Sequence, residues 1–210
     1  MHIKRKTIPN FWPVPKTGTK YLAVPVHEQN NSITLMMAIG DILKLVKAIN
    51  EDIITLTGGS HPTYTAEDIL DFKYLDYVIM GEGELPMLQF LNALNSSTDV
   101  STIGGIAYKV QGKKFANHQL QYIRDINDLP LPATHLLDME MYFEINLPQN
   151  PYPQCKRVAQ IITSRGCPFT CSYCCNDVLK EVYKDERYLR RRSVENVIKE
   201  LRIMKERIKY

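Results

Sequence analysis

Three cysteines in one short segment have the types and spacing to hold an iron–sulfur cluster. Cys167, Cys171 and Cys174 form the pattern CxxxCxxC. Clusters are usually held by four thiolates, so three thiolates from one loop would leave one iron open to a non-protein ligand. All five cysteines lie between Cys155 and Cys175, and such a local group favours metal or redox chemistry over a disulfide framework. The sequence therefore predicts a three-cysteine site for a [4Fe-4S] cluster.

The spacing leaves alternatives open for this site. A zinc site would need a fourth ligand, from Cys155, Cys175 or a histidine, to close a tetrahedral set. A group of redox-active thiols is a further alternative. Cys175 directly follows the third cysteine of the motif, and we expect it to be a neighbouring thiol because adjacent side chains point apart. Cys155 has no partner at a recognised spacing, so we do not expect it to be a ligand.

Two glycine-rich segments provide a second group of candidate binding residues. Gly58 and Gly59 follow one apolar run, and Gly81 and Glu82 follow another. A glycine pair at the end of a strand lets a bulky ligand approach the backbone, where a side chain would block it. The alternatives are a plain tight turn for the glycines and, for Glu82, a favourable charge at the start of the next helix.

These residues must be positioned by helices that alternate with short apolar strands. Apolar spacing predicts helices from residue 39 to 49 and after 84, strands at 53–56 and 76–80, a turn at 57–63 and a short helix at 67–72. The alternation is typical of an α/β fold with a parallel, doubly wound sheet, whose ligands lie at the carboxyl ends of the strands.

The second half of the chain has a different pattern. A hairpin at 103–117 and a proline-rich linker precede a predicted strand at 158–163, which leads into the cysteines, and an amphipathic helix starts at Ser193. We expect a poorly defined lead-in at residues 1–38, followed by an α/β domain at 39–127. A linker at 128–157 then leads to a cysteine-bearing domain at 158–210.

The cysteine segment resembles the radical S-adenosylmethionine superfamily in its spacing, its leading strand and the aromatic Tyr173 just before the third cysteine. The resemblance implies that the open iron of the cluster binds S-adenosylmethionine, which one electron then cleaves to a 5'-deoxyadenosyl radical. It implies that Tyr173 lies against the adenine, the alternative being an aromatic packed within the loop. It also implies an electron donor such as flavodoxin or ferredoxin, and the first strand, loop and helix of a (β/α) barrel.

The upstream segments 58–63 and 76–84 resemble the cobalamin-binding branch of that superfamily. This implies a Rossmann-like domain in which Gly58, Gly59, Gly81 and Glu82 are candidate cofactor-binding residues, with cobalamin as a further cofactor. The implied reaction is methyl transfer to, or a related modification of, an unactivated carbon of a small molecule. The Asp-x-His-x-x-Gly segment that supplies an axial histidine in many such domains is absent from this sequence.

The chain resembles a truncated member of this branch, because the start of the cobalamin domain and most of the barrel are missing from the pattern. A fragment that binds only cluster or cobalamin is therefore an alternative to an enzyme, as is a zinc-binding interaction module. A second chain could supply the rest of the barrel. The sequence leaves open whether this chain alone is an enzyme.

Composition and charge narrow the remaining classes. Hydrophobic residues at 44% and charged residues at 23% are typical of a globular protein. The net charge of +3 is too small to favour a nucleic-acid partner, and we expect the arginines at 190–192 to form a solvated or cluster-facing patch. The apolar stretch around 33–39 is far shorter than the roughly 20 residues that cross a bilayer. We therefore expect a cytoplasmic protein without a membrane span.

Overall fold

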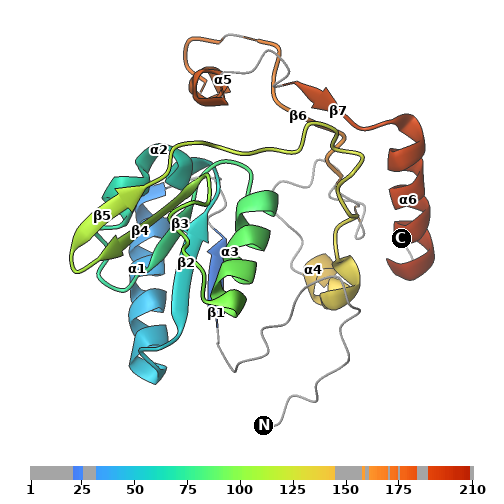
Figure 1. Ribbon diagram of the computed structural model, residues 1–210. Helices are drawn as coiled ribbons and strands as arrows, with labels where there is room; N and C mark the ends of the chain where they lie inside the picture. Colours follow the sequence, from blue (N-terminus) through green and yellow to red (C-terminus); the bar gives the residue numbers. More distant parts are fainter. Residues whose placement is uncertain are drawn as a thin grey trace. The chain divides into compact units, whose positions relative to one another are not determined.

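The computed structural model describes residues 21–25, 32–144, 158, 161–169, 171–174, 176–183 and 189–208 (Figure 1). Backbone proximity divides the chain into two compact units, residues 1–122 and 123–210, and each is described by itself. Cys155 and Cys175 lie outside the described residues, so the expectations for these two thiols are not addressed by the structure.

The first unit is built on a five-stranded sheet in the order β1-β2-β3-β4-β5. Its strands are β1 (Tyr21–Pro25), β2 (Ile54–Gly58), β3 (Tyr77–Ile79), β4 (Ile106–Val110) and β5 (Lys113–Ala116). The first three strands run parallel, whereas β4 and β5 are antiparallel to their neighbours. The predicted α/β sheet is confirmed, and the predicted hairpin forms its antiparallel side.

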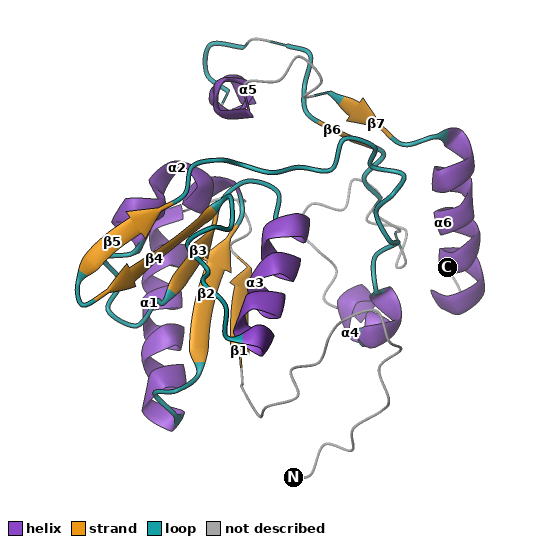
Figure 2. Cartoon of the chain, in the orientation of Figure 1, coloured by secondary structure: helices purple, strands orange, loops and turns teal. Residues whose placement is uncertain are grey.

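Three helices cover the two faces of this sheet, as Figure 2 shows. They are α1 (Ser32–Ile49), α2 (Ser60–Ile69) and α3 (Glu84–Ser96). Helices α1 and α2 lie on one side of the sheet and α3 lies on the other (Figure 2). This arrangement is the doubly wound architecture that the alternation of helices and strands predicts. No described helix is long and apolar enough to cross a membrane.

The two sides of the sheet carry separate hydrophobic cores, because successive side chains of a strand point to opposite faces. On the side of α1 and α2, the buried residues are Leu43, Ala66, Ile69, Leu70, Leu75, Val78, Met80 and Ala107. On the side of α3, they are Leu56, Ile79, Phe90, Ala93, Ile103 and Ile106. Both cores hold the parallel strands in place, and with them the loops at the strands' carboxyl ends.

Several element boundaries differ from the sequence prediction: α1 begins at Ser32 and not at 39, and α2 spans 60–69 and not 67–72. The segment 57–63 is not a simple turn, because β2 runs to Gly58 and α2 begins at Ser60. The change of direction is made at Gly59, whose φ of 111° is readily adopted by glycine. Strand β1 also lies inside the predicted lead-in, where it pairs in parallel with β2 along its whole length.

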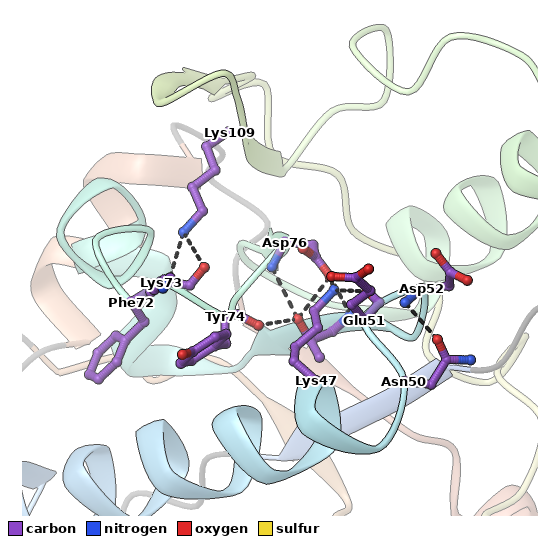
Figure 3. Close-up of polar contacts among 10 residues, drawn as sticks. Lys47, Asn50, Glu51, Asp52, Phe72, Lys73, Tyr74, Asp76 and Lys109 are labelled. Atoms are coloured by element: carbon purple, nitrogen blue, oxygen red, sulfur yellow. Dashed lines mark hydrogen bonds and ion pairs between the residues drawn. The ribbon is translucent and has the colours of Figure 1, made fainter.

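A polar cluster joins the amino ends of β2 and β3 (Figure 3). The Asp76 carboxylate accepts hydrogen bonds from Lys47 Nζ at 2.7 Å and from the Thr55 backbone N–H at 2.8 Å. Thr55 is fully buried, and its hydroxyl donates to the carbonyl oxygen of Tyr74 at 2.6 Å. The cluster anchors helix α1 to the strands at the end opposite the glycine-rich segments.

The end of α2 is held by a lysine from β4 (Figure 3). Lys109 Nζ donates to the carbonyl oxygens of Leu70 at 3.0 Å and Phe72 at 2.5 Å. A basic side chain at a helix C-terminus satisfies carbonyls that lack an intrahelical partner. Burial lowers the pKa of Lys109, and the nearby Asp76 and Asp71 charges oppose that shift.

The second unit contains a short two-stranded sheet and several short helices. The strands β6 (Ser164–Arg165) and β7 (Arg190–Arg191) pair antiparallel. The helical elements are η1 (Thr134–Leu136), α4 (Met139–Glu144), α5 (Asn176–Tyr183) and α6 (Val194–Ile208). The predicted amphipathic helix from Ser193 is thus confirmed as α6.

The strand predicted at 158–163 is wrong at the positions that the structure describes. Residues 158 and 161–163 are not in a strand, and the segment becomes a strand only at β6. Arg192 Nη1 donates a hydrogen bond to the carbonyl oxygen of Ile162 at 2.9 Å. The backbone N–H of Arg192 donates to the carbonyl oxygen of Thr163, also at 2.9 Å. An arginine therefore satisfies backbone groups that a longer strand pair would have satisfied.

Candidate functional site

The carboxyl ends of β2 and β3 bring the predicted glycines to one edge of the sheet. Gly58 is in register with Ile79, so the residues that follow each strand lie at the same end. Gly59 and Gly81 have φ of 111° and 74°. Gly59 is exposed, and Gly58 and Gly81 are half-buried. The structure therefore groups Gly58, Gly59 and Gly81, although they come from two segments about twenty residues apart.

The geometry supplies a backbone reason for each of these glycines. A Cβ atom on Gly58 would lie 3.0 Å from the carbonyl oxygen of Ile79 in the neighbouring strand. The positive φ of Gly59 and Gly81 is rarely adopted by residues with a side chain. Tight turns and close strand packing thus account for the three glycines, and the exposed Gly59 leaves its backbone accessible to a ligand.

Glu82 lies just before the N-terminus of α3. It is half-buried, and Gly83 after it caps the helix, with the Met87 N–H donating to the Gly83 carbonyl at 2.9 Å. Glu84 is the acidic residue of the first turn. A carboxylate at this position is favourable next to the helix dipole. The helix-start alternative for Glu82 is therefore consistent with the structure, and its contact with a cofactor stays a prediction.

A residue that sequence reasoning did not select joins the two glycine segments. Thr63, in the first turn of α2, has its Oγ1 2.7 Å from the carbonyl oxygen of Gly59 and 2.8 Å from the backbone nitrogen of Gly81. The hydroxyl donates to the first and accepts from the second. Thr63 stands within the glycine motif, but its partner Gly81 is 18 residues away and only the folded sheet brings the two together.

The predicted cluster cysteines lie on a turn between β6 and α5. Gly166, with φ 84°, redirects the chain directly before Cys167. The backbone N–H of Cys174 donates to the carbonyl oxygen of Cys171 at 3.0 Å, which closes a short turn between the second and third cysteines. All three thiols are free and half-buried. The structure therefore places them on one compact loop.

The loop is tied to helix α5 by two side chains. The Asn176 amide nitrogen lies 3.4 Å from Cys174 Sγ, as a hydrogen-bond donor to the sulfur. Lys180 Nζ donates to the carbonyl oxygen of Phe169 at 2.5 Å. Hydrogen bonds to cysteine sulfur are among the factors that set the reduction potential of an iron–sulfur cluster. The surroundings of the third cysteine therefore fit a thiolate ligand.

Among the residues that the structure describes, no three histidine, cysteine, aspartate or glutamate side chains stand where they could hold one metal ion. A tetrahedral zinc set would need a fourth ligand, and two of its candidates, Cys155 and Cys175, lie outside the described residues. A cluster places its own irons and sulfides between the thiolates, so its ligands need not converge on a single point. Three free thiols on one turn are a donor set that fits a cluster, and the assignment of Cys167, Cys171 and Cys174 stays a prediction.

Tyr173 projects away from the protein, with 91% of its surface exposed. The alternative that it packs within the loop is therefore wrong. Phe169 of the same loop is also largely exposed, at 68%. The side chain of Tyr173 is thus free of intramolecular packing, and its predicted contact with adenine is not addressed by the structure.

The arginines at 190–192 do not form a simple solvated patch. Arg190 is only 6% exposed, and its Nη1 donates to the carbonyl oxygen of Ile123 at 2.7 Å. Arg191 is exposed, whereas the side chain of Arg192 is 10% exposed. Charged side chains are seldom buried without partners, so sequence alone favours exposure for such a run. Pairing in the folded unit reverses that expectation for Arg190 and Arg192.

Arg192 connects α6 to the segment that leads into the cysteine loop. It forms an ion pair with Glu200, whose side chain is 5% exposed, and its Nε donates to Asn196 Oδ1 at 2.7 Å. On its other side it donates to the carbonyls of Ile162 and Thr163. A cavity of about 210 Å³ lies beside this network. The network fixes the residues just ahead of β6.

A family model described as a B12 binding domain matches residues 31–91. This range covers β2, β3 and the glycines at their carboxyl ends. The match agrees with the observed sheet, which has helices on both faces. The fold and the matched range define the first unit as an α/β domain of the B12-binding type.

The similarity to curated relatives covers more than half of the chain, so it reaches into the second half, which contains the cysteines. A cytidylyl-2-hydroxyethylphosphonate methyltransferase of Streptomyces wedmorensis is 31% identical over 181 residues, which cover 76% of this chain and 33% of that protein. An anaerobic magnesium-protoporphyrin IX monomethyl ester cyclase of Rubrivivax gelatinosus is 36% identical over 137 residues, covering 63% of this chain and 23% of the cyclase. The chain therefore spans a third or less of the length of these relatives.

A solved structure has the same fold. The radical S-adenosylmethionine methyltransferase TsrM from Kitasatospora setae, solved with cobalamin and a [4Fe-4S] cluster bound, superposes with a TM-score of 0.62 at 14% identity. The superposition covers 91% of this chain and 36% of TsrM. Together, these matches bear out the resemblance predicted from the sequence: residues 31–91 match a B12 binding domain, and the chain has the fold of a solved radical S-adenosylmethionine methyltransferase that binds cobalamin and a [4Fe-4S] cluster.

Proposed function

We propose that this chain binds a [4Fe-4S] cluster through Cys167, Cys171 and Cys174 and takes part in radical S-adenosylmethionine chemistry. One observation carries the proposal: a CxxxCxxC loop with three free, half-buried thiols follows a B12-binding-type domain in the same chain. A zinc module would give no reason for that combination. When bound, such a cluster supplies the electron for reductive cleavage of S-adenosylmethionine.

The residues around the cysteines have distinct proposed tasks. Gly166 turns the backbone so that the loop can wrap a cluster, and Asn176 donates its amide hydrogen toward Cys174 Sγ. Lys180 holds the loop backbone against α5 through Phe169. Tyr173, exposed and unpacked, is available to lie against the adenine of S-adenosylmethionine.

We also propose that the edge formed by Gly58, Gly59, Gly81 and Glu82 binds cobalamin. The support is the family match over residues 31–91 and the grouping of the three glycines at the carboxyl ends of β2 and β3. The proposal takes residues 39–127 as the cobalamin-type domain, 128–157 as the linker and 158–210 as the start of the radical domain. It adds strand β1 to the first of these, because β1 pairs with β2.

For the whole protein, we propose methyl transfer to, or a related modification of, an unactivated carbon of a small molecule. Relatives named as a methyltransferase and a cyclase support this class of reaction. The reaction would need an electron donor such as flavodoxin or ferredoxin in the cytoplasm. Because the chain spans only part of its relatives, the remaining barrel would come from further sequence or from a second chain.

The decisive experiment is anaerobic reconstitution of the purified chain with iron and sulfide. We expect roughly four irons per chain and visible absorption typical of a cluster, both lost in Cys171→Ala. The matched control is Cys175→Ala, which removes a thiol next to the motif and should keep the iron. Bound zinc with no iron would contradict the cluster and identify a zinc module. Iron retained by Cys171→Ala but lost in Cys175→Ala would contradict the ligand assignment.

Activity is tested separately from cluster binding. The reconstituted chain is given S-adenosylmethionine and a strong reductant, and 5'-deoxyadenosine is quantified. Formation of this product supports catalysis by the chain itself. A bound cluster without product would identify a fragment that binds the cofactor but does not use it.

A further inference from the structure

One hydroxyl group links the two glycine turns at the ligand edge of the sheet. Thr63 Oγ1 donates to the carbonyl oxygen of Gly59 and accepts the backbone N–H of Gly81, at 2.7 and 2.8 Å. Its backbone N–H also donates to the Gly59 carbonyl at 3.1 Å. Thr63 thus contacts the turn after β2 and the turn after β3 at the same time.

A second threonine in the same helix shows what is unusual about this contact. Thr65 stands at a kink in α2, where its φ of −126° and ψ of 29° are not helical, and its Oγ1 donates to the carbonyl oxygen of His61, four positions earlier, at 2.9 Å. Thr63 makes the equivalent bond to Gly59, but its hydroxyl also accepts a hydrogen bond from another part of the chain. Only the Thr63 contact reaches the neighbouring strand.

The two turns need such a connection because glycine restrains its own backbone poorly. Gly59 and Gly81 have φ of 111° and 74°, and glycine loses more conformational freedom on folding than any other residue. A hydrogen bond that bridges both turns lowers the number of relative positions they can adopt. A ligand that contacts both turns would then meet a surface that is already ordered, which lowers the entropic cost of binding.

We propose that Thr63 is a positioning residue that holds the turns after β2 and β3 as one preorganised surface for cobalamin. This inference rests on the proposed binding of cobalamin at that edge. Thr63 itself need not touch the ligand: it acts through the backbone of Gly59 and Gly81. The role predicts an effect on ligand affinity that depends on the hydroxyl group and not on the size of the side chain.

Three substitutions separate the bridge from the general stability of α2. Thr63→Val removes the hydroxyl and keeps a branched side chain, and Thr63→Ser keeps the hydroxyl. Thr65→Val is the matched control, because it removes a hydroxyl and a hydrogen bond from the same helix without touching the second turn. Any general weakening of the helix should therefore appear in Thr63→Val and Thr65→Val alike.

The test is a titration of each full chain with hydroxocobalamin, followed by its visible spectrum, together with hydrogen exchange of the Gly81 amide without ligand. We expect Thr63→Val to bind about tenfold more weakly and to lose protection at Gly81, because a neutral hydrogen bond contributes about that factor. Thr63→Ser and Thr65→Val should stay within about twofold of the wild type.

The outcomes distinguish the inference from the function on which it rests. If the wild-type chain does not bind hydroxocobalamin, the proposed cobalamin site is wrong and the positioning role is overturned with it. If the wild type binds but Thr63→Val binds equally well, only the positioning role is overturned. A Thr63→Ser chain as weak as Thr63→Val, or an equal loss in Thr65→Val, would also overturn it.

Discussion

Replacing Glu200 by glutamine is expected to loosen helix α6 and the segment ahead of the cysteine loop. Glu200 and Arg192 form an ion pair in which the two side chains are 5% and 10% exposed. A carboxylate oxygen of Glu200 is in direct contact with Arg192 Nη1, so its negative charge compensates the buried positive charge of Arg192. Glutamine keeps the shape of the side chain and removes its charge.

The size of the effect follows from burial. Removing one partner of a buried ion pair typically costs about 3–5 kcal/mol, because the other charge remains buried without compensation. Arg192 would keep its hydrogen bonds to Asn196 and to the Ile162 carbonyl, which favours the lower part of that range. A loss of about 3 kcal/mol is a large share of the 5–15 kcal/mol that stabilises a typical domain.

The assay is hydrogen exchange of the α6 amides, read by mass spectrometry on the full chain. A loss of about 3 kcal/mol should accelerate exchange by about two orders of magnitude in the middle of the helix. Glu206→Gln, on the exposed side of the same helix, is the matched control and should change stability by less than about 0.5 kcal/mol.

A double substitution makes the reasoning about charge refutable. Arg192→Met combined with Glu200→Leu removes both charges, and this chain should recover part of the protection lost in Glu200→Gln. Unchanged exchange in Glu200→Gln would show that the ion pair contributes nothing. A double variant less protected than Glu200→Gln would show that hydrogen bonds of Arg192, and not the uncompensated charge, dominate.

Two further predictions concern the first unit. Gly105 and Gly112 have φ of 81° and 79°, but an added Cβ would meet a backbone oxygen at 2.9 Å at Gly105 and no atom within 4 Å at Gly112. Gly105→Ala should therefore lower the free energy of unfolding by about 1–3 kcal/mol more than Gly112→Ala in urea titrations, and equal losses would argue against the steric contact. Burial, with the charges of Asp76 and Tyr108, raises the pKa of Tyr77 above its ordinary value of 10.0, so the unfolded chain loses this proton first. This contribution to stability is fully present below pH 10.0 and is lost as pH rises from there through the folded pKa. Tyr77→Phe should therefore flatten the loss of stability above about pH 10, and an unchanged slope would contradict the assignment.

Much of the first unit could be predicted because its signals are local. Strand β2, strand β3 and helix α3 each carry an apolar pattern that a short window reveals. The same holds for the cysteine loop, since its three thiols are neighbours in sequence. Strand β1 could not be predicted with the same certainty, because only its pairing with β2 distinguishes five apolar residues from a loop.

The features that sequence reasoning missed depend on contacts between distant residues. The Thr63 hydroxyl meets Gly81 only when two strands are paired. Arg190 is buried because a carbonyl 67 residues earlier in the chain accepts its hydrogen bond. Gly58 faces the Ile79 carbonyl across the sheet, so the need for glycine there comes partly from the neighbouring strand. No pattern within a short window contains these partners.

The hairpin of β4 and β5 also affects how this protein meets other copies of itself. Strand β5 is the last strand of the described sheet and has four residues, of which Lys113 and Lys114 are charged. Lys114 is engaged with Asp71 at 2.6 Å. A short edge strand that carries lysines resists pairing with another strand, because the charges would have to be brought together and stripped of water. This edge of the folded sheet is therefore poorly suited to pairing with the edge of a second copy.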